Sequence, residues 1–351
     1  MVARRFPTDT FIVAALLAVI TWGFWYLFGG GQAVCANLAD HWQISLTMIF
    51  GSLIAGATSE GGGAVAFPVF TKLLDITAQD AKVFSLAIQS VGMSAASLVI
   101  ISMGVRVEWR VIYWVSIGGI AGITLGAAVI APLISQSLIK MLFTVMLTSF
   151  ALTLIALNRN LPLRHMRLPR LDHAERGILL LTGFIGGTTS GLVGNGIDIV
   201  AFSVMVLLFR INEKIATPTS VILMAINALV GFLLHLTVLG GFTAEVKDYW
   251  LAAIPVVVVG APLGAMICNW MDRIIVVRVL IMLIAIELIS SLLIIPLTME
   301  VIMVSLISLI VFFVMYYTMY RSDTYAHGKL QEQQYKDIRT NDAGIEVVSK
   351  M

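Results

Sequence analysis

Two glycine-rich stretches interrupt an otherwise apolar chain and place polar groups where an ion could bind. The first stretch reads Ser59-Glu60-Gly61-Gly62-Gly63, and the second reads Gly194-Asn195-Gly196-Ile197-Asp198. Each glycine costs a helix about 1 kcal/mol relative to alanine, so both stretches are expected to break a helix. At membrane depth the N–H and C=O groups freed by a break must face protein or water. The chemistry expected at both breaks is therefore ion binding.

A helix that restarts after such a break favours an anion, because its first N–H groups are free and carry a partial positive charge. Helices are expected to restart near Ala64 and Ile197. Side chains beside the breaks and in the following spans add further donors. The alternative role of the glycines is close packing of two hairpin tips, and that of Gln89 and Asn227 is helix contact. The predicted substrate-binding residues are Ser59, Gly61, Gly62, Gly63, Gln89, Thr189, Ser190, Gly194, Asn195, Gly196 and Asn227.

Three carboxylates, those of Glu60, Asp198 and Glu287, lie in apolar surroundings. A charge inside a membrane is expensive, so such residues are functional candidates by default. We predict that they couple transport to protons. The alternatives are an ion pair with Lys82 or Lys214, a position at a wet hairpin tip or, for Glu287, a protonated structural group.

The composition is that of a polytopic helical membrane protein. The 351 residues are 59% hydrophobic and 12% charged, whereas about a quarter of a soluble domain is charged. Cys35 and Cys268 are far apart and show no metal-ligand spacing. We therefore expect no metal site, no cofactor and no nucleic-acid partner. The expected partners are a small anion and the lipid bilayer, and self-association is left open.

The apolar segments form two similar halves. Residues 56–59 (Gly-Ala-Thr-Ser) are echoed 131 positions later (187 − 56) by residues 187–190 (Gly-Thr-Thr-Ser), and the GxxxG pair at 122 and 126 by that at 260 and 264. Two interrupted apolar segments in matching places point to a transporter binding site. The GxxxG pairs are predicted to pack helices closely. Broken pieces are predicted at 44–59, 64–74, 178–191 and 197–210, and full spans at 82–103, 111–132, 137–157, 215–239, 249–269 and 276–296.

The chain divides at its polar loops. Arg4 and Arg5 precede an apolar run that is either a signal peptide or a first membrane helix; its length and Trp22 and Trp25 near its end favour the helix. Pro218 is expected in the first turn of its helix. The predicted parts are an N-terminal transmembrane helix and loop (1–43), repeat 1 (44–157), a basic cytoplasmic linker (158–177), repeat 2 (178–296), a last transmembrane helix (297–320) and a polar cytoplasmic tail (321–351).

Basic residues predict the topology, because short cytoplasmic loops are rich in Lys and Arg. If each broken segment is a hairpin that returns to its own side, all the arginine-rich loops and both termini fall inside. If each broken segment crosses once, the linker with five arginines falls outside. The hairpin arrangement is therefore favoured, and it makes the two repeats inverted relative to each other. The predicted fold is all-α, with two inverted repeats of one re-entrant hairpin plus three transmembrane helices, and one extra helix at each terminus.

The two breaks, the segment Glu213-Lys214-Ile215-Ala216-Thr217-Pro218-Thr219-Ser220 and the duplicated layout resemble the sulfite exporter TauE/SafE family, also called the toluene-sulfonate uptake permeases, over residues 44–296. The resemblance implies a secondary transporter or facilitator for small sulfur-containing or organic anions such as sulfite, sulfonates and sulfoacetate. The expected location is the bacterial inner membrane. The chain departs from the family pattern at Glu60 and at Asn195 to Asp198.

Three other functions are alternatives, of which a pure assembly or scaffold role would leave the broken helices unexplained. A cation or metal permease would use Glu60, Asp198 and Glu287, but no His/Cys/Met cluster of metal-ligand type accompanies them. An intramembrane enzyme would need a paired nucleophile and base. The chain has no GxSxG or HExxH motif, and His235 has no evident partner, so we expect no enzymatic activity.

Overall fold

The protein is a bundle of helices in a computed structural model that describes residues 8–58, 69–71, 74, 76–158, 165, 168 and 172–322. The first break, with Ser59, Glu60, Gly61, Gly62 and Gly63, lies outside the described residues. Three π-helical turns and one 3-10 turn extend some helices: η1 (Gly126–Ile130), η2 (Ala131–Leu133), η3 (Val204–Leu208) and η4 (His235–Leu239). The α-helices are α1 (Thr8–Phe28), α2 (Gln32–Asp40), α3 (Trp42–Ala57), α5 (Ala78–Ser102), α6 (Trp109–Leu125), α7 (Gln136–Asn158), α8 (His173–Val193), α9 (Ile197–Ser203), α10 (Glu213–Leu234), α11 (Ala244–Trp270), α12 (Arg273–Ile294) and α13 (Met299–Arg321).

Eight helical segments in these ranges are long and apolar enough to cross a membrane, which confirms the predicted helical, multi-pass architecture. One predicted length is wrong. α8 was expected as a short piece over 178–191, but it has 21 residues and is itself long enough to cross. It starts earlier because Asp172 and Glu175 form a capping box, in which the Asp172 N–H donates to the Glu175 carboxylate at 2.9 Å. Because this first turn is polar, a hydrophobicity pattern places the start of the helix too late.

α6 and α8 pack backbone against backbone through glycines spaced four residues apart. A Cβ on Gly122 would lie 2.1 Å from the Phe184 carbonyl oxygen, and one on Gly187 would lie 2.3 Å from the Gly119 carbonyl oxygen. Neither distance is sterically possible, so only glycine fits at these positions. The close-packing role predicted for the GxxxG pairs is confirmed.

α3 and α11 pack in the same manner. Their contacts match those of α8 and α6, but not with the alignment of residues 56–59 on 187–190 that the sequence echo suggests. A Cβ on Gly56 would meet the Ala261 carbonyl oxygen at 2.0 Å, and one on Gly191 would meet the Ile123 carbonyl oxygen at 2.7 Å. The GxxxG echo pairs Gly122 with Gly260, and therefore position 123 with position 261. Gly56 and Gly191 contact these two matching positions, so Gly56 corresponds to Gly191 rather than to Gly187. Glycines recur every four residues in α8, so the echo by itself cannot distinguish registers one turn apart.

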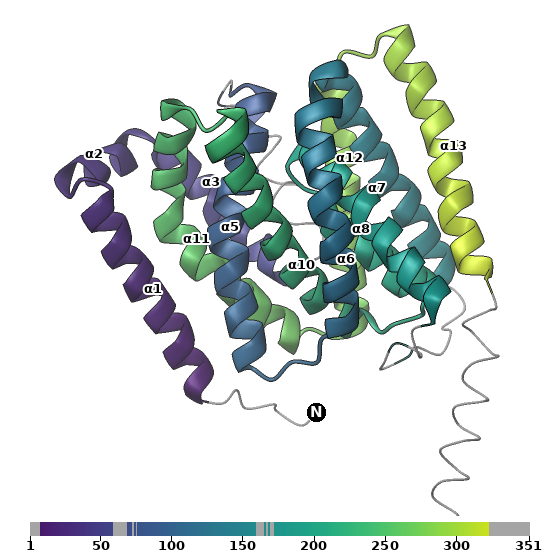
Figure 1. The fold of residues 1–351 in the computed structure, drawn as a ribbon, viewed down its shortest axis with the longest axis horizontal. Helices are drawn as coiled ribbons and strands as arrows, with labels where there is room; N and C mark the ends of the chain where they lie inside the picture. Colours follow the sequence, from purple (N-terminus) through teal and green to yellow (C-terminus); the bar gives the residue numbers. More distant parts are fainter. Residues whose placement is uncertain are drawn as a thin grey trace, which may run out of the picture.

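The helices run back and forth between two ends of the bundle, with the start of α1 and the end of α13 at the lower end in Figure 1. We call the lower end the basic end, because every arginine among the described residues lies there, at positions 106, 110, 176, 210, 273, 278 and 321. We call the upper end the acidic end, because it carries Asp40, Asp80, Glu245, Asp248 and Glu300 and none of these arginines.

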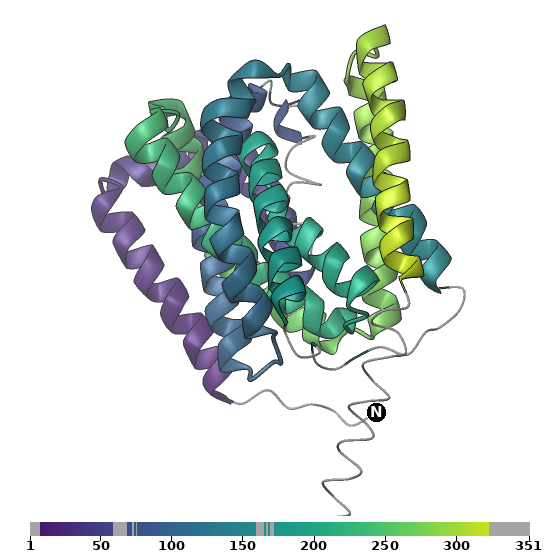
Figure 2. The ribbon, with the colours of Figure 1, turned by 45° about the vertical axis from the view of Figure 1, so that its right-hand side comes forward.

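α1 and α13 lie on opposite flanks of the bundle (Figure 1, Figure 2). α1 is attached to α11 by two indole groups: Trp22 Nε1 donates to the Pro255 carbonyl at 3.0 Å, and Trp25 Nε1 donates to the Leu251 carbonyl at 2.7 Å. Pro255 has no N–H, so Leu251 loses its usual helical donor and Trp25 replaces it. Pro218 was expected in a first turn but lies inside α10, as the sixth residue of the helix that starts at Glu213.

Candidate functional site

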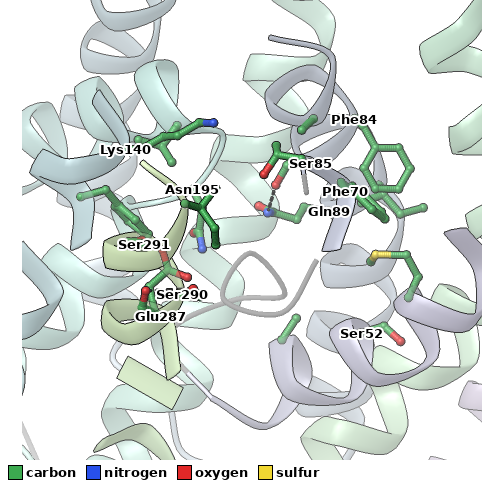
Figure 3. Close-up of a pocket in the computed structure, with 18 of the residues that line it drawn as sticks. Ser52, Phe70, Phe84, Ser85, Gln89, Lys140, Asn195, Glu287, Ser290 and Ser291 are labelled. Carbon is green, nitrogen blue, oxygen red and sulfur yellow. Dashed lines mark hydrogen bonds between the residues drawn. The ribbon is translucent and has the colours of Figure 1, made fainter. Parts of the chain in front are cut away.

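A cavity lies between α3, α5, α7, α12 and the second break (Figure 3). Its walls include Phe84 and Ser85 near the start of α5, Lys140 near the start of α7, and Ile294 at the end of α12. These three helix ends belong to the acidic end of the bundle. The cavity therefore occupies the half of the bundle nearer the acidic end, and it reaches inward to Asn195 at the break.

The α5 wall of the cavity is tied to the second break by a short chain of hydrogen bonds. Gln89 Nε2 donates to Ser85 Oγ at 2.7 Å, and Ser85 Oγ donates to the Gly194 carbonyl at 3.3 Å. Asn195, the next residue, lies on the facing side of the cavity (Figure 3). Amide groups from the two halves of the chain thus share one cavity.

The opposite wall carries the two charged side chains found among the described lining residues. Lys140 of α7 and Glu287 of α12 interact electrostatically. The Glu287 carboxylate accepts hydrogen bonds from Ser291 Oγ at 3.2 Å and from Thr144 Oγ1 at 3.4 Å, and these two hydroxyls lie 2.8 Å apart. Lys140 is the only cationic side chain among the described residues that line the cavity.

The second break is held by its own side chains. Gly194 ends α8 with φ +89°, and Gly196 precedes α9 with φ +152°, two conformations that glycine adopts readily. The N–H of Gly196 donates to Asp198 Oδ1 at 3.2 Å, and the N–H of Ile197 donates to Ser190 Oγ at 3.0 Å. The backbone donors expected to bind an anion at this break are therefore occupied within the break itself.

Asp198 is 1% exposed, and its Oδ2 atom has no hydrogen-bond partner in the described part of the chain. Thr189 donates to the Ile185 carbonyl of its own helix at 2.9 Å. Asn227 is buried, with its Oδ1 atom 3.1 Å from where a Cβ on Gly119 would lie, so it faces α6.

The cavity gathers three of the predicted site residues that the structure describes, namely Gln89, Asn195 and Glu287. Six others lie outside its lining: Thr189, Ser190, Gly194, Gly196, Asp198 and Asn227. Glu287 and Asp198, paired in the alternative cation-permease hypothesis, thus do not share this cavity. Across the described ranges no group of three or more His, Cys, Asp or Glu side chains could hold a metal ion.

The cavity is also lined by polar residues that are not among the predicted site residues: Ser52, Thr71, Ser85, Lys140, Ser290 and Ser291. For two of them a signal exists in the sequence, because Ser290 and Ser291 follow Glu287 by three and four positions. Side chains at that spacing share one helix face. Polar residues clustered on one face of an apolar span predict a cavity or a partner helix.

Comparison with known proteins gives one match. The profile of the family described as Sulfite exporter TauE/SafE matches residues 44–292. No curated protein and no solved structure matches the chain. The match covers more than half of the chain, and the eight apolar helices agree with a transporter family of multi-pass membrane proteins. The chain belongs to the sulfite exporter TauE/SafE family.

Proposed function

We propose that this protein is a secondary transporter of a small sulfur-containing or organic anion of the sulfite, sulfonate or sulfoacetate type, and that the anion binds in the cavity of Figure 3. The observation that carries the proposal is that Lys140, the single cation among the described lining residues, shares one cavity with the amides of Gln89 and Asn195.

The donor set suits a compact oxyanion. A lysine ammonium supplies a point charge with three donors, and amide and hydroxyl groups add directed hydrogen bonds to several oxygens. Glu287 would oppose an anion, but its carboxylate already accepts from Thr144 and Ser291 and interacts with Lys140. We infer that protonation of Glu287, the one predicted coupling residue among the described lining residues, would remove the carboxylate charge that competes with the substrate for Lys140.

We further propose that the second broken segment is a re-entrant hairpin. His165, ahead of α8, and Ile211, after η3, form a parallel bridge. The His165 N–H donates to the Arg210 carbonyl at 2.8 Å, and the Asn212 N–H donates to the His165 carbonyl at 3.0 Å. The chain therefore enters and leaves the segment at the same end of the bundle, which supports a return to its own side.

The glycine contacts support a duplication of the two halves. α3 on α11 and α8 on α6 use glycine-to-carbonyl contacts in one shared register. With the first hairpin opening at the acidic end and the second at the basic end, the repeats would be inverted, an arrangement that underlies alternating access in many transporters.

We assign the basic end to the cytoplasm, because all described arginines lie there. Both ends of the described chain, α1 and α13, then start and finish on the cytoplasmic side. The cavity would face the outside of a bacterial inner membrane.

The test is uptake of labelled sulfite into proteoliposomes, with sulfonates and carboxylates as competitors and with an imposed pH gradient. We expect Lys140→Gln to lower uptake at least about tenfold, the equivalent of ~1.4 kcal/mol of binding free energy, and Lys140→Arg to retain more of it. The control is Lys247→Gln, which removes an exposed lysine at the same end of the bundle. Equal uptake by Lys140→Gln and Lys247→Gln would overturn the proposed site.

A further inference from the structure

A second, smaller pocket lies between α3, α5, α10 and α11 on the side of the basic end. It is bounded by the last turns of α3, α5 and α11 and by the first turns of α10. Its polar side chains are Lys214, Thr217 and Asn269, and it also contains Cys268. No carboxylate is among the described residues that line it, so its only formal charge is positive.

The pocket contains an unsatisfied donor. Thr217 is 1% exposed, and its hydroxyl oxygen has no hydrogen-bond partner in the described part of the chain. A buried hydroxyl without a partner is destabilising unless something else binds to it. The neighbouring Lys214 ammonium donates one hydrogen bond, to the Asn269 carbonyl at 3.1 Å, and a lysine ammonium has three N–H donors.

The pocket and the cavity lie on either side of the last turn of α3. Ala55 lines the cavity, and Gly56, the next residue, lines the pocket. The same relation holds along α5, where Met93 lines the cavity and Ile100 lines the pocket two turns nearer the basic end. The two spaces are therefore consecutive along the direction from the acidic end to the basic end.

We propose that this pocket is a second anion site, in which Lys214 and Thr217 hold the transported anion on its way between the cavity and the basic end. The proposal rests on the proposed function for the nature of the anion, and on the pocket for its location. Lys214 would supply the charge, and the Thr217 hydroxyl would donate to an oxygen of the anion.

The chain provides a reporter for this site. Cys268 lines the pocket, and the other cysteine, Cys35, is exposed on α2. A Cys35→Ala protein therefore carries one thiol, inside the pocket. The rate of its alkylation by iodoacetamide reports access, and methanesulfonate serves as the probe anion because it does not react with thiols or with the reagent.

We expect methanesulfonate to slow alkylation of Cys268 in the full-length, detergent-solubilised protein. At about ten times its dissociation constant the slowing should approach tenfold, since only the unoccupied pocket reacts. Thr217→Val and Lys214→Gln should each remove this protection, whereas Thr217→Ser and the distant Lys247→Gln should keep it. Two different variants guard against a folding defect in one, and size-exclusion profiles check both.

Absence of protection at concentrations that compete for uptake would overturn the second site and leave the proposed function intact. Protection that survives both Thr217→Val and Lys214→Gln would also overturn it. Protection in a protein that transports no anion would instead support the pocket and overturn the proposed function. Protection that persists in Lys140→Gln, when that variant has lost uptake, would support a site separate from the cavity.

Discussion

The two ends of the bundle are built in opposite ways. Toward the acidic end, α7 and α12 border the cavity with Lys140, Glu287 and Ser291. Toward the basic end, the same α7 contributes Phe150 to a solid core, where its ring contacts those of Phe202 at 5.9 Å and Tyr316 at 5.8 Å between centroids. One helix thus lines an open space in one half and a packed aromatic cluster in the other.

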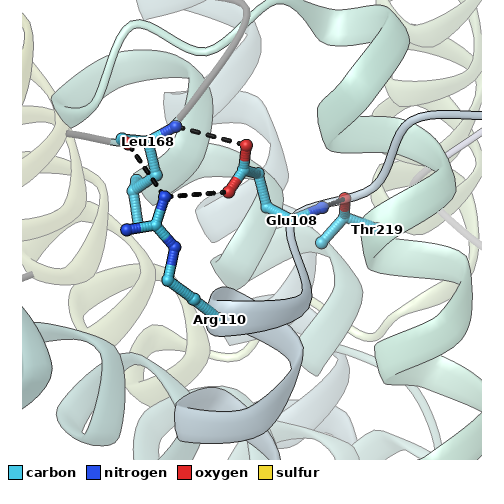
Figure 4. Close-up of polar contacts among 4 residues, drawn as sticks. All are labelled: Glu108, Arg110, Leu168 and Thr219. Atoms are coloured by element: carbon cyan, nitrogen blue, oxygen red, sulfur yellow. Dashed lines mark hydrogen bonds and ion pairs between the residues drawn. The ribbon is translucent and has the colours of Figure 1, made fainter. Parts of the chain in front are cut away.

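Hydrogen bonds also join the loops of the basic end to one another and to α10 (Figure 4). The Glu108 N–H donates to Thr219 Oγ1 at 3.1 Å, and the Glu108 carboxylate accepts from the Leu168 N–H at 3.2 Å. Arg110 donates to the Leu168 carbonyl at 3.2 Å. These bonds tie the α5–α6 connection to α10 and to the segment ahead of α8. The cavity therefore lies toward the acidic end, whereas the basic end is held by these bonds and by the aromatic cluster. Under the proposed function, transport would require the aromatic cluster to loosen.

The largest effect is expected where both halves are alike, in the glycine contacts. Gly183→Val and Gly56→Val would each drive a Cβ to 2.0 Å from a backbone carbonyl oxygen, that of Val115 and that of Ala261 respectively. Backbone cannot move aside cheaply, so we expect loss of monodisperse folded protein, measured by fluorescence size-exclusion chromatography. Gly177→Val is the control, because nothing lies within 4 Å of its Cβ. Normal profiles for Gly183→Val and Gly56→Val would contradict the close packing.

The second prediction compares two phenylalanines of α7. Phe150→Ala in the aromatic cluster should cost about 3–5 kcal/mol of unfolding free energy. Phe143→Ala should cost less, because Phe143 lines the cavity and already lacks packed atoms on one side. Unfolding in mixed micelles with increasing SDS measures both. Equal losses would show that the two halves are packed alike and would remove the contrast between the ends.

The third prediction concerns the fastening at the basic end. Glu108→Ala leaves the buried Leu168 N–H without its acceptor and should cost about 1–3 kcal/mol. Arg110→Ala should cost less than about 1 kcal/mol, because its side chain is 48% exposed and its 4.0 Å ion pair with Glu108 is partly solvated. Hydrogen exchange of the α5–α6 connection measures the opening directly. No change in exchange with Glu108→Ala would argue against a closed basic end.

The smallest effect is expected at the hydrogen bond that joins the halves across the cavity. Ser85→Ala and Ser97→Ala each remove one hydroxyl of α5 that donates to a backbone carbonyl, of Gly194 and of Met93 respectively. Each should change stability by only about 0.5–1.5 kcal/mol. Sulfite uptake should change its KM for Ser85→Ala alone, because only that hydroxyl contacts the second break. An equal shift for Ser97→Ala would indicate a general effect of α5 rather than one of the cavity.

Much of the architecture was predictable from local sequence. Apolar runs of membrane length predict spans wherever they occur, and the glycines at 194 and 196 predict a break because each glycine weakens a helix. Both glycines have positive φ angles in the structure. The GxxxG pairs predict close helix contacts because glycine has no Cβ to keep two helices apart. Errors arose at helix starts, where the capping box at Asp172 and the interior position of Pro218 depend on a few residues that the apolar pattern does not reveal.

What the sequence by itself determined is the helical, multi-pass character of the chain, the second break and the stripes of small residues that let helices touch. Only the tertiary structure decided which polar residues share a cavity. Lys140, Glu287 and Asn195 meet because α7, α12 and the second break pack together, although the chain separates them widely. A shift of α8 by one turn against α6 would bring other side chains to the cavity. Because glycine recurs every four residues in α8, the sequence allows both alignments, and only the packed helices decide between them.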